Sequence, residues 1–217
     1  MIFEPDFLDR MQRRILHQTA YLGVPAQKNP LDLWVYQEMI CQLRPDVVIE
    51  IGNAAGGGLL YLADVCELAG HGRAFGVDLS HAAMSCQIRT HNRIRLFTGD
   101  ACEEFRAVRA MIGPEDSVLV IEDSSHTYEN TLACLRFYSQ IIKPGGYYVV
   151  EDTICHHGLD EGPEPGPYEA VQAFLSENQD FEADRSRESF GLTWNPGGFL
   201  RRRDAVGSCS AATYKEA

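Results

Sequence analysis

The stretch DVVIEIGNAAGGG, residues 46–58, decides the fold. Its first half is rich in β-branched apolar residues and ends at Gly52, which is the pattern of a buried strand. The glycines that follow allow a tight turn and let the backbone approach a ligand where a helix begins. A buried strand, a glycine-rich turn and a helix, in this order, indicate one unit of an α/β sheet.

The same alternation continues along the chain. Further apolar runs predict strands at residues 73–78, 94–100, 117–123 and 146–152, with helices near residues 59–69 and 127–142. Such alternation is typical of a parallel sheet with helices on both faces, and right-handed crossovers make it doubly wound. Beyond these strands we expect a loop, a helix and two strands, at residues 158–167, 168–177, 181–190 and 198–203. The loop is rich in Gly, Pro and acid, and it is either a mobile lid or a plain surface loop.

The domain organisation follows from length and from this pattern. The 217 residues are enough for one hydrophobic core of ordinary size. Residues 1–45 look largely helical and form an N-terminal extension, and residues 46–205 form the α/β domain. Residues 206–217 are expected to be a disordered tail.

Charge and composition exclude several classes of partner. The formal net charge of −12 argues against binding nucleic acid or an anionic membrane surface. No apolar run approaches the roughly 20 residues of a membrane-spanning helix, and the first residues lack the apolar core of a secretory signal. The seven cysteines are scattered without a C-x-x-C pair, as expected of reduced thiols in a cytoplasmic protein. The oligomeric state is not determined, and a homo-oligomer stays open.

Acidic residues follow the predicted strands at the edge where ligands bind in such sheets. They are Glu50, Asp78, Asp100, Asp123, Glu151 and Asp152. A dinucleotide fingerprint needs G-x-G-x-x-G, but Ala54 stands at its second glycine. S-adenosylmethionine carries cationic sulfonium and ammonium groups, which suit an acid beside the glycine turn. The predicted cofactor-binding residues are Glu50, Gly52, Asn53, Gly57, Asp78, Asp100 and Ala101.

A second acidic group indicates a hard metal ion. Asp123, Glu151 and Asp152 follow two strands that we expect to be neighbours, and carboxylate oxygens of this kind suit Mg²⁺. His126 lies three residues after Asp123 at the expected helix start, and its ordinary pKa of about 6.5 fits a general base. The alternative is that these acids are N-caps and loop residues. His156 and His157 are weaker candidates for the base.

Three motifs resemble a known family. EIGNAAGGG, EDSSHTYEN and VVEDT are similar to the cephalosporin hydroxylase-type family and to the sugar O-methyltransferases of macrolide and rhamnose tailoring, over roughly Gln27 to Arg203. The resemblance implies a Rossmann-like class I methyltransferase fold, whose mostly parallel sheet has seven strands with the seventh antiparallel. It implies that Glu50, Gly52, Asp78 and Asp100 contact the cofactor, that the three acids named above bind Mg²⁺, and that His126 is the base. The family often has Ser where this chain has Gly58, and Lys28 matches a basic position of unassigned role.

The predicted function is therefore transfer of a methyl group from S-adenosylmethionine to a hydroxyl of a small molecule. The expected acceptor is a natural-product sugar or a similar diol, as in antibiotic biosynthesis, and Mg²⁺ and His126 assist. Two alternatives stay open at this point. One is an NAD-dependent oxidoreductase on the same fold. The other is a non-catalytic accessory subunit for a partner tailoring enzyme.

Overall fold

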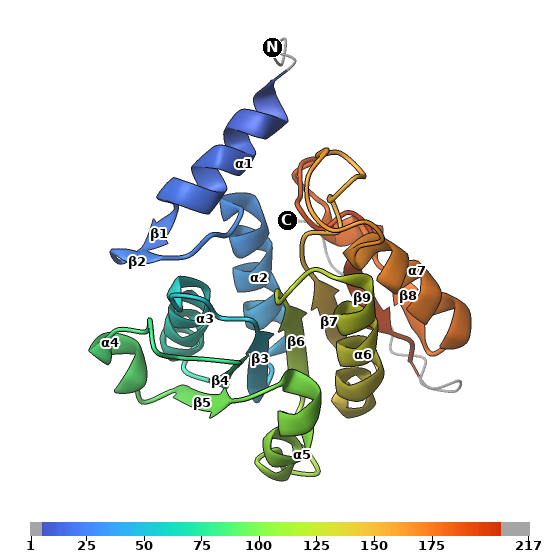
Figure 1. Cartoon of the computed structure of the whole chain (residues 1–217). Helices are drawn as coiled ribbons and strands as arrows, with labels where there is room; N and C mark the ends of the chain where they lie inside the picture. The colour runs from blue at the N-terminus through green and yellow to red at the C-terminus, as the bar shows by residue number, and fades with distance from the viewer. Residues whose placement is uncertain (1–5, 205–217) are drawn as a thin grey trace, which may run out of the picture.

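The computed structural model describes residues 6–204, so the tail expected at residues 206–217 lies outside the described residues. A seven-stranded sheet has the order β5-β4-β3-β6-β7-β9-β8 (Figure 1). Its strands are β3 (Val47–Ile51), β4 (Arg73–Asp78), β5 (Ile94–Thr98), β6 (Val118–Glu122), β7 (Tyr147–Val150), β8 (Phe181–Ala183) and β9 (Phe199–Arg202). The strands from β5 to β7 are parallel, and β9 is antiparallel to both β7 and β8. The predicted fold class, including the antiparallel strand, is confirmed.

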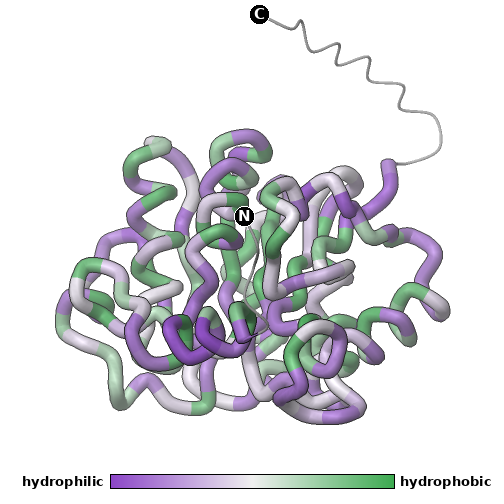
Figure 2. The backbone as a smooth tube through the Cα atoms, turned by 90° about the horizontal axis from the view of Figure 1, so that it is seen from above, coloured by the Kyte–Doolittle hydropathy of each residue, from purple (hydrophilic) through white to green (hydrophobic). Residues whose placement is uncertain are grey.

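Helices cover both faces of the sheet (Figure 1). The α-helices are α1 (Phe7–Gln18), α2 (Pro30–Leu43), α3 (Gly57–Leu68), α4 (Cys86–Arg89), α5 (Ala101–Ala110), α6 (Tyr128–Tyr138) and α7 (Pro167–Glu177). Helices α5, α6 and α7 pack on one face, while α2 and α3 pack on the other. Because both faces are buried, β3 and β6 are apolar along most of their length rather than alternating. Figure 2 shows hydrophobic and hydrophilic residues alternating along the helices, as expected when each buries one side.

Two sequence-based boundaries are wrong. The strand predicted at residues 181–190 ends at Ala183, because the Asp184 carboxylate accepts a hydrogen bond from the Ser186 amide at 3.0 Å and starts the 3₁₀ helix η2 (Arg185–Arg187). The helix predicted at residues 127–142 is α6, which ends at Tyr138 and continues as the 3₁₀ helix η1 (Ser139–Ile141). Short 3₁₀ turns of this kind commonly end α-helices.

The N-terminal region is attached to the end of the sheet where the acidic residues lie. Helices α1 and α2 supply the predicted helical character, and an unpredicted hairpin of β1 (Ala20–Tyr21) and β2 (Val24–Pro25) separates them. Ile15 of α1 packs with Ile154, Leu159 and Trp194 in a small apolar cluster. Helix α1 and the loop after β7 therefore lie at the same end of the sheet (Figure 1). Within residues 6–204, no helix is long and apolar enough to cross a membrane.

Candidate active site

The glycine turn after β3 lies against the end of β6. Gly52 has a φ of +83°, which favours glycine, and a Cβ there would overlap the backbone carbonyl of Asp123. The Gly52 amide donates to the Val77 carbonyl at 2.8 Å, which continues the pairing of β3 with β4. A side chain at residue 52 would therefore separate the two strand ends that carry the candidate cofactor and metal residues.

Asp78 and Asp100 organise the backbone around them. Oδ2 of Asp78 accepts from the amides of Asn53 and Ala54 at 2.7 and 3.1 Å, so this carboxylate holds the glycine turn in place. Asp100 is the N-cap of α5, and its Oδ1 accepts from the amides of Cys102 and Glu103. Each aspartate thus uses at least one oxygen within the protein.

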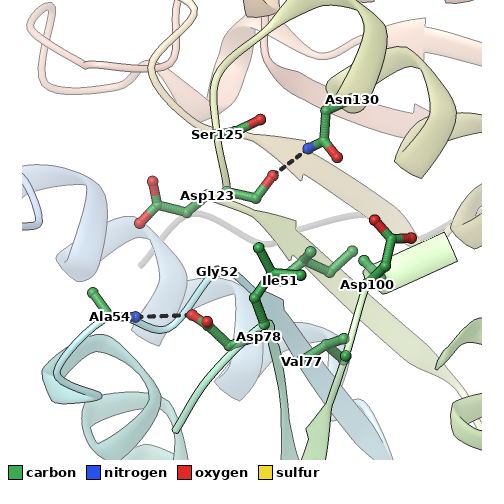
Figure 3. A pocket seen from close by; sticks show the side chains of 13 residues that line it. Ile51, Gly52, Ala54, Val77, Asp78, Asp100, Asp123, Ser125 and Asn130 are labelled. Atoms are coloured by element: carbon green, nitrogen blue, oxygen red, sulfur yellow. Dashed lines mark hydrogen bonds between the residues drawn. The ribbon is translucent and has the colours of Figure 1, made fainter. Parts of the chain in front are cut away.

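A cavity of about 320 Å³ opens between these strand ends. Figure 3 shows Asp78, Asp100 and Asp123 arranged around it, from the ends of β4, β5 and β6. The lining also includes apolar side chains, among them Ile51, Val77 and Leu79. Of the predicted cofactor residues, Gly52, Asp78, Asp100 and Ala101 line this cavity.

Three predicted cofactor residues lie elsewhere. Glu50 and Asn53 line a second, adjoining cavity, which is described below. Gly57 lines neither cavity, and a Cβ on it would overlap the carbonyl oxygen of Pro25. Gly57 therefore allows α3 to approach the β1–β2 hairpin.

A buried hydrogen-bonded chain crosses the ends of three strands, and sequence reasoning missed its central residue, His81. Asn53 Nδ2 donates to Glu50 Oε2 at 2.9 Å, so its Oδ1 is left to accept from His81 Nε2 at 3.2 Å. The other ring nitrogen of His81 then accepts from the Thr98 hydroxyl at 2.8 Å. Burial lowers the pKa of His81, which agrees with a neutral imidazole in this chain.

Asp123, His126 and Asp152 form a compact group around the second cavity. His126 Nε2 lies 3.6 Å from Asp123 Oδ1 and 3.5 Å from Asp152 Oδ2, and each residue offers one ligand atom within 4.8 Å of the others. The second cavity, of about 160 Å³, is lined by all three residues. His126 has a φ of +57° and precedes the N-cap Thr127, so it lies in the turn before α6 and not in the helix.

Lys28 stands behind this group and contacts three carboxylates. Its ammonium lies 2.5 Å from Asp123 Oδ2, 2.8 Å from Glu151 Oε1 and 3.2 Å from Glu50 Oε1. Glu151 therefore faces Lys28 and is not a member of the three-residue group that includes Asp152. Only the family resemblance pointed to Lys28, because it lies 95 residues from Asp123 and 123 from Glu151.

A further set of polar residues supports the two acids after β7. The Asp152 amide donates to Asn195 Oδ1 at 3.1 Å, and Asn195 Nδ2 donates to the Tyr36 hydroxyl at 2.8 Å. Burial raises the pKa of Tyr36, and the nearby Glu151 carboxylate acts in the same direction. Asp152 has a φ of +56°, so these bonds maintain a conformation that is rare outside glycine. No sequence signal identified Tyr36 or Asn195.

The charges of the site are unbalanced. Burial raises the pKa of Asp123 to about 6 although Lys28 opposes it, and burial raises the pKa of Glu151 well above its ordinary value. Burial disfavours the charged forms of His126 and Lys28, but the neighbouring carboxylates outweigh it and raise the pKa of both. Two basic side chains, Lys28 and His126, face four carboxylates here, so an additional cation would be stabilised.

The donor set fits a hard dication and a cationic cofactor. Carboxylate oxygens of Asp123 and Asp152 are ligands that Mg²⁺ prefers. Glu50 Oε1 is buried and has no hydrogen-bond partner among residues 6–204, although the Lys28 ammonium is nearby. His126 Nδ1 is likewise buried without a partner in the described part of the chain. Such groups are rare in folded proteins unless something else contacts them.

His156 and His157 line neither cavity and instead hold the loop after β7. His156 Nε2 hydrogen-bonds the Gly162 carbonyl at 3.0 Å, and His157 Nε2 contacts Glu169 Oε1 at 2.6 Å. This geometry gives both histidines a structural role in the loop at residues 158–167.

The chain resembles known proteins over most of its length. The family model described as rhamnosyl O-methyltransferase/CmcI matches residues 13–203. A rhamnosyl O-methyltransferase of Mycobacterium tuberculosis is 32% identical over 192 residues, which cover 85% of this chain and 78% of the relative. A rhamnosyl O-methyltransferase of Mycobacterium leprae is 30% identical over 197 residues, which cover 87% of this chain and 85% of the relative.

Two solved structures show the same fold. The CmcI-N160 apo-structure superposes with a TM-score of 0.67 at 24% identity, covering 86% of this chain and 77% of that one. The structure described as CmcI-D160 with Mg and SAM gives a TM-score of 0.65 at 22% identity, covering 85% and 76%. At this level of identity the superpositions support the architecture described above.

Proposed function

This chain belongs to the rhamnosyl O-methyltransferase/CmcI family, and from that membership we propose that it transfers a methyl group from S-adenosylmethionine to a hydroxyl of a small molecule. One observation carries the proposal beyond the family level. The two cavities adjoin, since both are lined by Gly52, Ala54, Asp123 and Ser124. A donor held in the first cavity and an acceptor held in the second would therefore meet at the ends of β3 and β6.

The first cavity supplies the donor site. S-adenosylmethionine brings a methyl group that its sulfonium already activates, so the protein has mainly to bind and orient it. Asp78 and Asp100 offer carboxylate oxygens at the cavity, and Ile51, Val77 and Leu79 offer apolar surface. Glu50 lies beside the shared wall with an oxygen free of hydrogen bonds among the described residues, which suits the positive charge of the donor.

The second cavity supplies the acceptor site. Asp123 and Asp152 would hold Mg²⁺, with Glu151 as the proposed third acid, and the ion would contribute Lewis acidity toward the acceptor oxygens. His126 is the proposed general base. Its Nε2 faces the two aspartates while its Nδ1 is buried, so Nε2 is the atom that accepts the hydroxyl proton.

The acceptor is proposed to be a natural-product sugar, of the rhamnosyl kind named for the relatives, or a similar diol, as in antibiotic biosynthesis. The two cavities are of a size for small ligands and not for a macromolecule. A cytoplasmic location is part of the proposal, because the six described cysteines are all free, as in a reducing compartment.

The proposal is tested with the purified chain alone. Calorimetry should detect binding of S-adenosylhomocysteine but not of NAD, and labelled donor should methylate a member of a panel of rhamnosides and other sugars. Excess chelator should abolish transfer. Binding of NAD with no binding of S-adenosylmethionine or S-adenosylhomocysteine would favour the oxidoreductase alternative. Binding of S-adenosylmethionine without turnover until a partner enzyme is added would favour the accessory subunit.

A further inference from the structure

Lys28 is the only group that contacts acids of both halves of the site within residues 6–204. Its side chain is 4% exposed, and its ammonium donates hydrogen bonds to Asp123 and Glu151 and lies 3.2 Å from Glu50 Oε1. Two of these carboxylates, on Asp123 and Glu151, belong to the proposed metal site, and the third, on Glu50, belongs to the proposed donor site. Lys28 is neither a proposed metal ligand nor the proposed base.

Lys28 also determines how Asp123 is presented. The ammonium holds Oδ2 of Asp123, so the other oxygen, Oδ1, is the one that lies 3.6 Å from His126 Nε2. Glu151 is held in the same way, because its Oε1 accepts from the Lys28 ammonium at 2.8 Å. Without the ammonium, Asp123 Oδ2 would lose its donor, and Glu151 would lose the cation that favours its charged form.

Gly58 provides the space for the contact with Glu50. A Cβ at residue 58 would overlap Glu50 Oε1 and would lie 2.7 Å from Lys28 Cε. Both atoms are near the ends of flexible side chains, so a small side chain at residue 58 would displace them without breaking the backbone. In this chain Gly58 therefore leaves the space that the Glu50 carboxylate and the Lys28 side chain occupy.

We propose that Lys28 is a positioning residue shared by the two halves of the site, which orients the metal-binding acid Asp123 while it holds the donor-binding acid Glu50. The inference rests on the proposed function and assigns a role that the proposed function does not contain. Removing Lys28 should therefore weaken both dication affinity and donor affinity. A residue that served only the stability of the fold would account for neither.

The test measures binding and not turnover. Mn²⁺ binding is followed by electron paramagnetic resonance, and S-adenosylhomocysteine binding by calorimetry, in wild type and in Lys28→Met. Removing a residue that orients metal ligands typically costs about 10–100-fold in metal affinity. We expect a loss of that order for Mn²⁺ and a weaker affinity for S-adenosylhomocysteine. Lys28→Arg, which keeps the charge and the donors, should recover part of both.

Two further variants separate positioning from folding. Glu50→Gln removes the donor-side charge while Lys28 keeps its hydrogen bonds to Asp123 and Glu151, so S-adenosylhomocysteine affinity should fall while Mn²⁺ affinity stays near that of wild type. Lys143→Met makes the same change as Lys28→Met at an exposed lysine, and both affinities should be unchanged. Because Glu50→Gln leaves the buried ammonium in place, its result is informative even if Lys28→Met does not fold.

Three results would overturn the inference. The first is Mn²⁺ affinity in Lys28→Met equal to or tighter than in wild type while S-adenosylhomocysteine still binds, since the ammonium would then only compete with the metal. The second is Glu50→Gln losing Mn²⁺ and S-adenosylhomocysteine affinity to the same extent. The third is wild type binding neither ligand, and only this result removes the proposed function as well.

Discussion

His126 acquires its position from a single backbone conformation. Its positive φ turns the chain just before α6 and directs the imidazole back toward Asp123 and Asp152. A residue that began a regular helix at this place would not be directed in this way. The three-residue spacing predicted that His126 lies near Asp123, and the turn also brings it near Asp152.

His126→Gln should lower kcat by about 10²–10⁴-fold, which is the usual contribution of a general base. Glutamine keeps much of the size and polarity of histidine but cannot accept the hydroxyl proton at neutral pH. The affinity for S-adenosylhomocysteine should be unchanged. Steady-state kinetics and calorimetry check both statements, with His71→Gln, at the solvent-facing pair with Asp46, as the matched control.

The same variant distinguishes a base from a ligand, because His126 Nε2 is also near enough to the aspartates to contact a metal. If His126 acts as a base, Mn²⁺ affinity in His126→Gln stays at the wild-type value while kcat falls. A parallel fall in Mn²⁺ affinity and kcat would contradict the base assignment and make His126 a ligand.

Asp152→Asn should greatly weaken dication binding while the affinity for S-adenosylhomocysteine persists. The substitution removes the negative charge of one of the two aspartates in the compact group. It keeps the shape of the side chain and the hydrogen bond from the backbone amide of residue 152 to Asn195 Oδ1. Mn²⁺ titration measures the effect. Asp160→Asn makes the same change at a fully exposed loop aspartate and should bind Mn²⁺ like wild type. Unaltered Mn²⁺ affinity in Asp152→Asn would remove Asp152 from the metal site.

At the scale of elements, the turn between β3 and α3 depends on contact with β6. Three strand ends meet there, because Gly52 pairs with the end of β4 and lies against Asp123 after β6. The glycines of this turn have different functions. Gly52 allows strand ends to approach, Gly57 allows a helix to approach the hairpin, and Gly58 leaves room for two charged side chains.

Gly52→Ala should destabilise the protein more than a change of backbone freedom alone explains. An alanine at residue 52 would have to adopt a positive φ, and its Cβ would overlap the Asp123 carbonyl. Overpacking of this kind typically costs about 1–3 kcal/mol in addition to the backbone strain. Gly70→Ala is the matched control, since Gly70 also has a positive φ but has open space around it. Thermal unfolding should show the larger loss for Gly52→Ala, and equal losses would contradict the close approach.

At the scale of the whole molecule, α2 connects the N-terminal region to the segment before β9. The Asp32 carboxylate accepts from the Thr193 hydroxyl at 2.6 Å, from the Trp194 amide at 2.9 Å and from Asn29 Nδ2 at 2.9 Å. Burial nevertheless raises the pKa of Asp32 to about 6, because it outweighs these three hydrogen bonds. The contact between α2 and the segment before β9 joins residues more than 160 positions apart, and burial favours the neutral form of its Asp32 carboxyl.

This raised pKa has a definite consequence for stability. An unfolded aspartate has a pKa of about 3.9, so between about pH 4 and pH 6 the folded state binds more protons than the unfolded state. The contribution of Asp32 to stability is therefore fully present at low pH and is lost as pH rises through about 6. Asp32→Asn should remove up to roughly 3 kcal/mol of pH dependence across this window.

Denaturant unfolding from pH 4 to pH 7 in the absence of dication measures this slope. Asparagine can accept from Trp194 and Asn29 with its oxygen and donate to Thr193 with its amide, so the fold should tolerate the change. Asp184→Asn is the control, because the pKa of Asp184 is lowered and not raised. Identical slopes for wild type and Asp32→Asn would contradict the buried-carboxyl explanation.

Local sequence patterns were enough to predict the sheet and the residues at its carboxyl edge. Asp78, Asp100 and Asp123 each end or follow an apolar run, and parallel strands bring such ends together whatever the helices between them contain. The period of the apolar residues and the glycine turn are local properties, so they can be read from neighbouring residues alone. The assignment of donor, metal and base residues remains a prediction that the experiments above address.

Only the tertiary structure decided which residues complete the site. No local pattern marks Lys28, Tyr36, His81 and Asn195. The first two and Asn195 become partners of the edge residues because α2, the residues just before it and the segment before β9 fold back over the strand ends. His81 reaches Asn53 from the loop after β4. The same packing turned Glu151 toward Lys28 while Asp152 joined His126. Contacts between residues about 40 to 160 positions apart depend on how the elements pack, and no periodicity of the sequence encodes that packing.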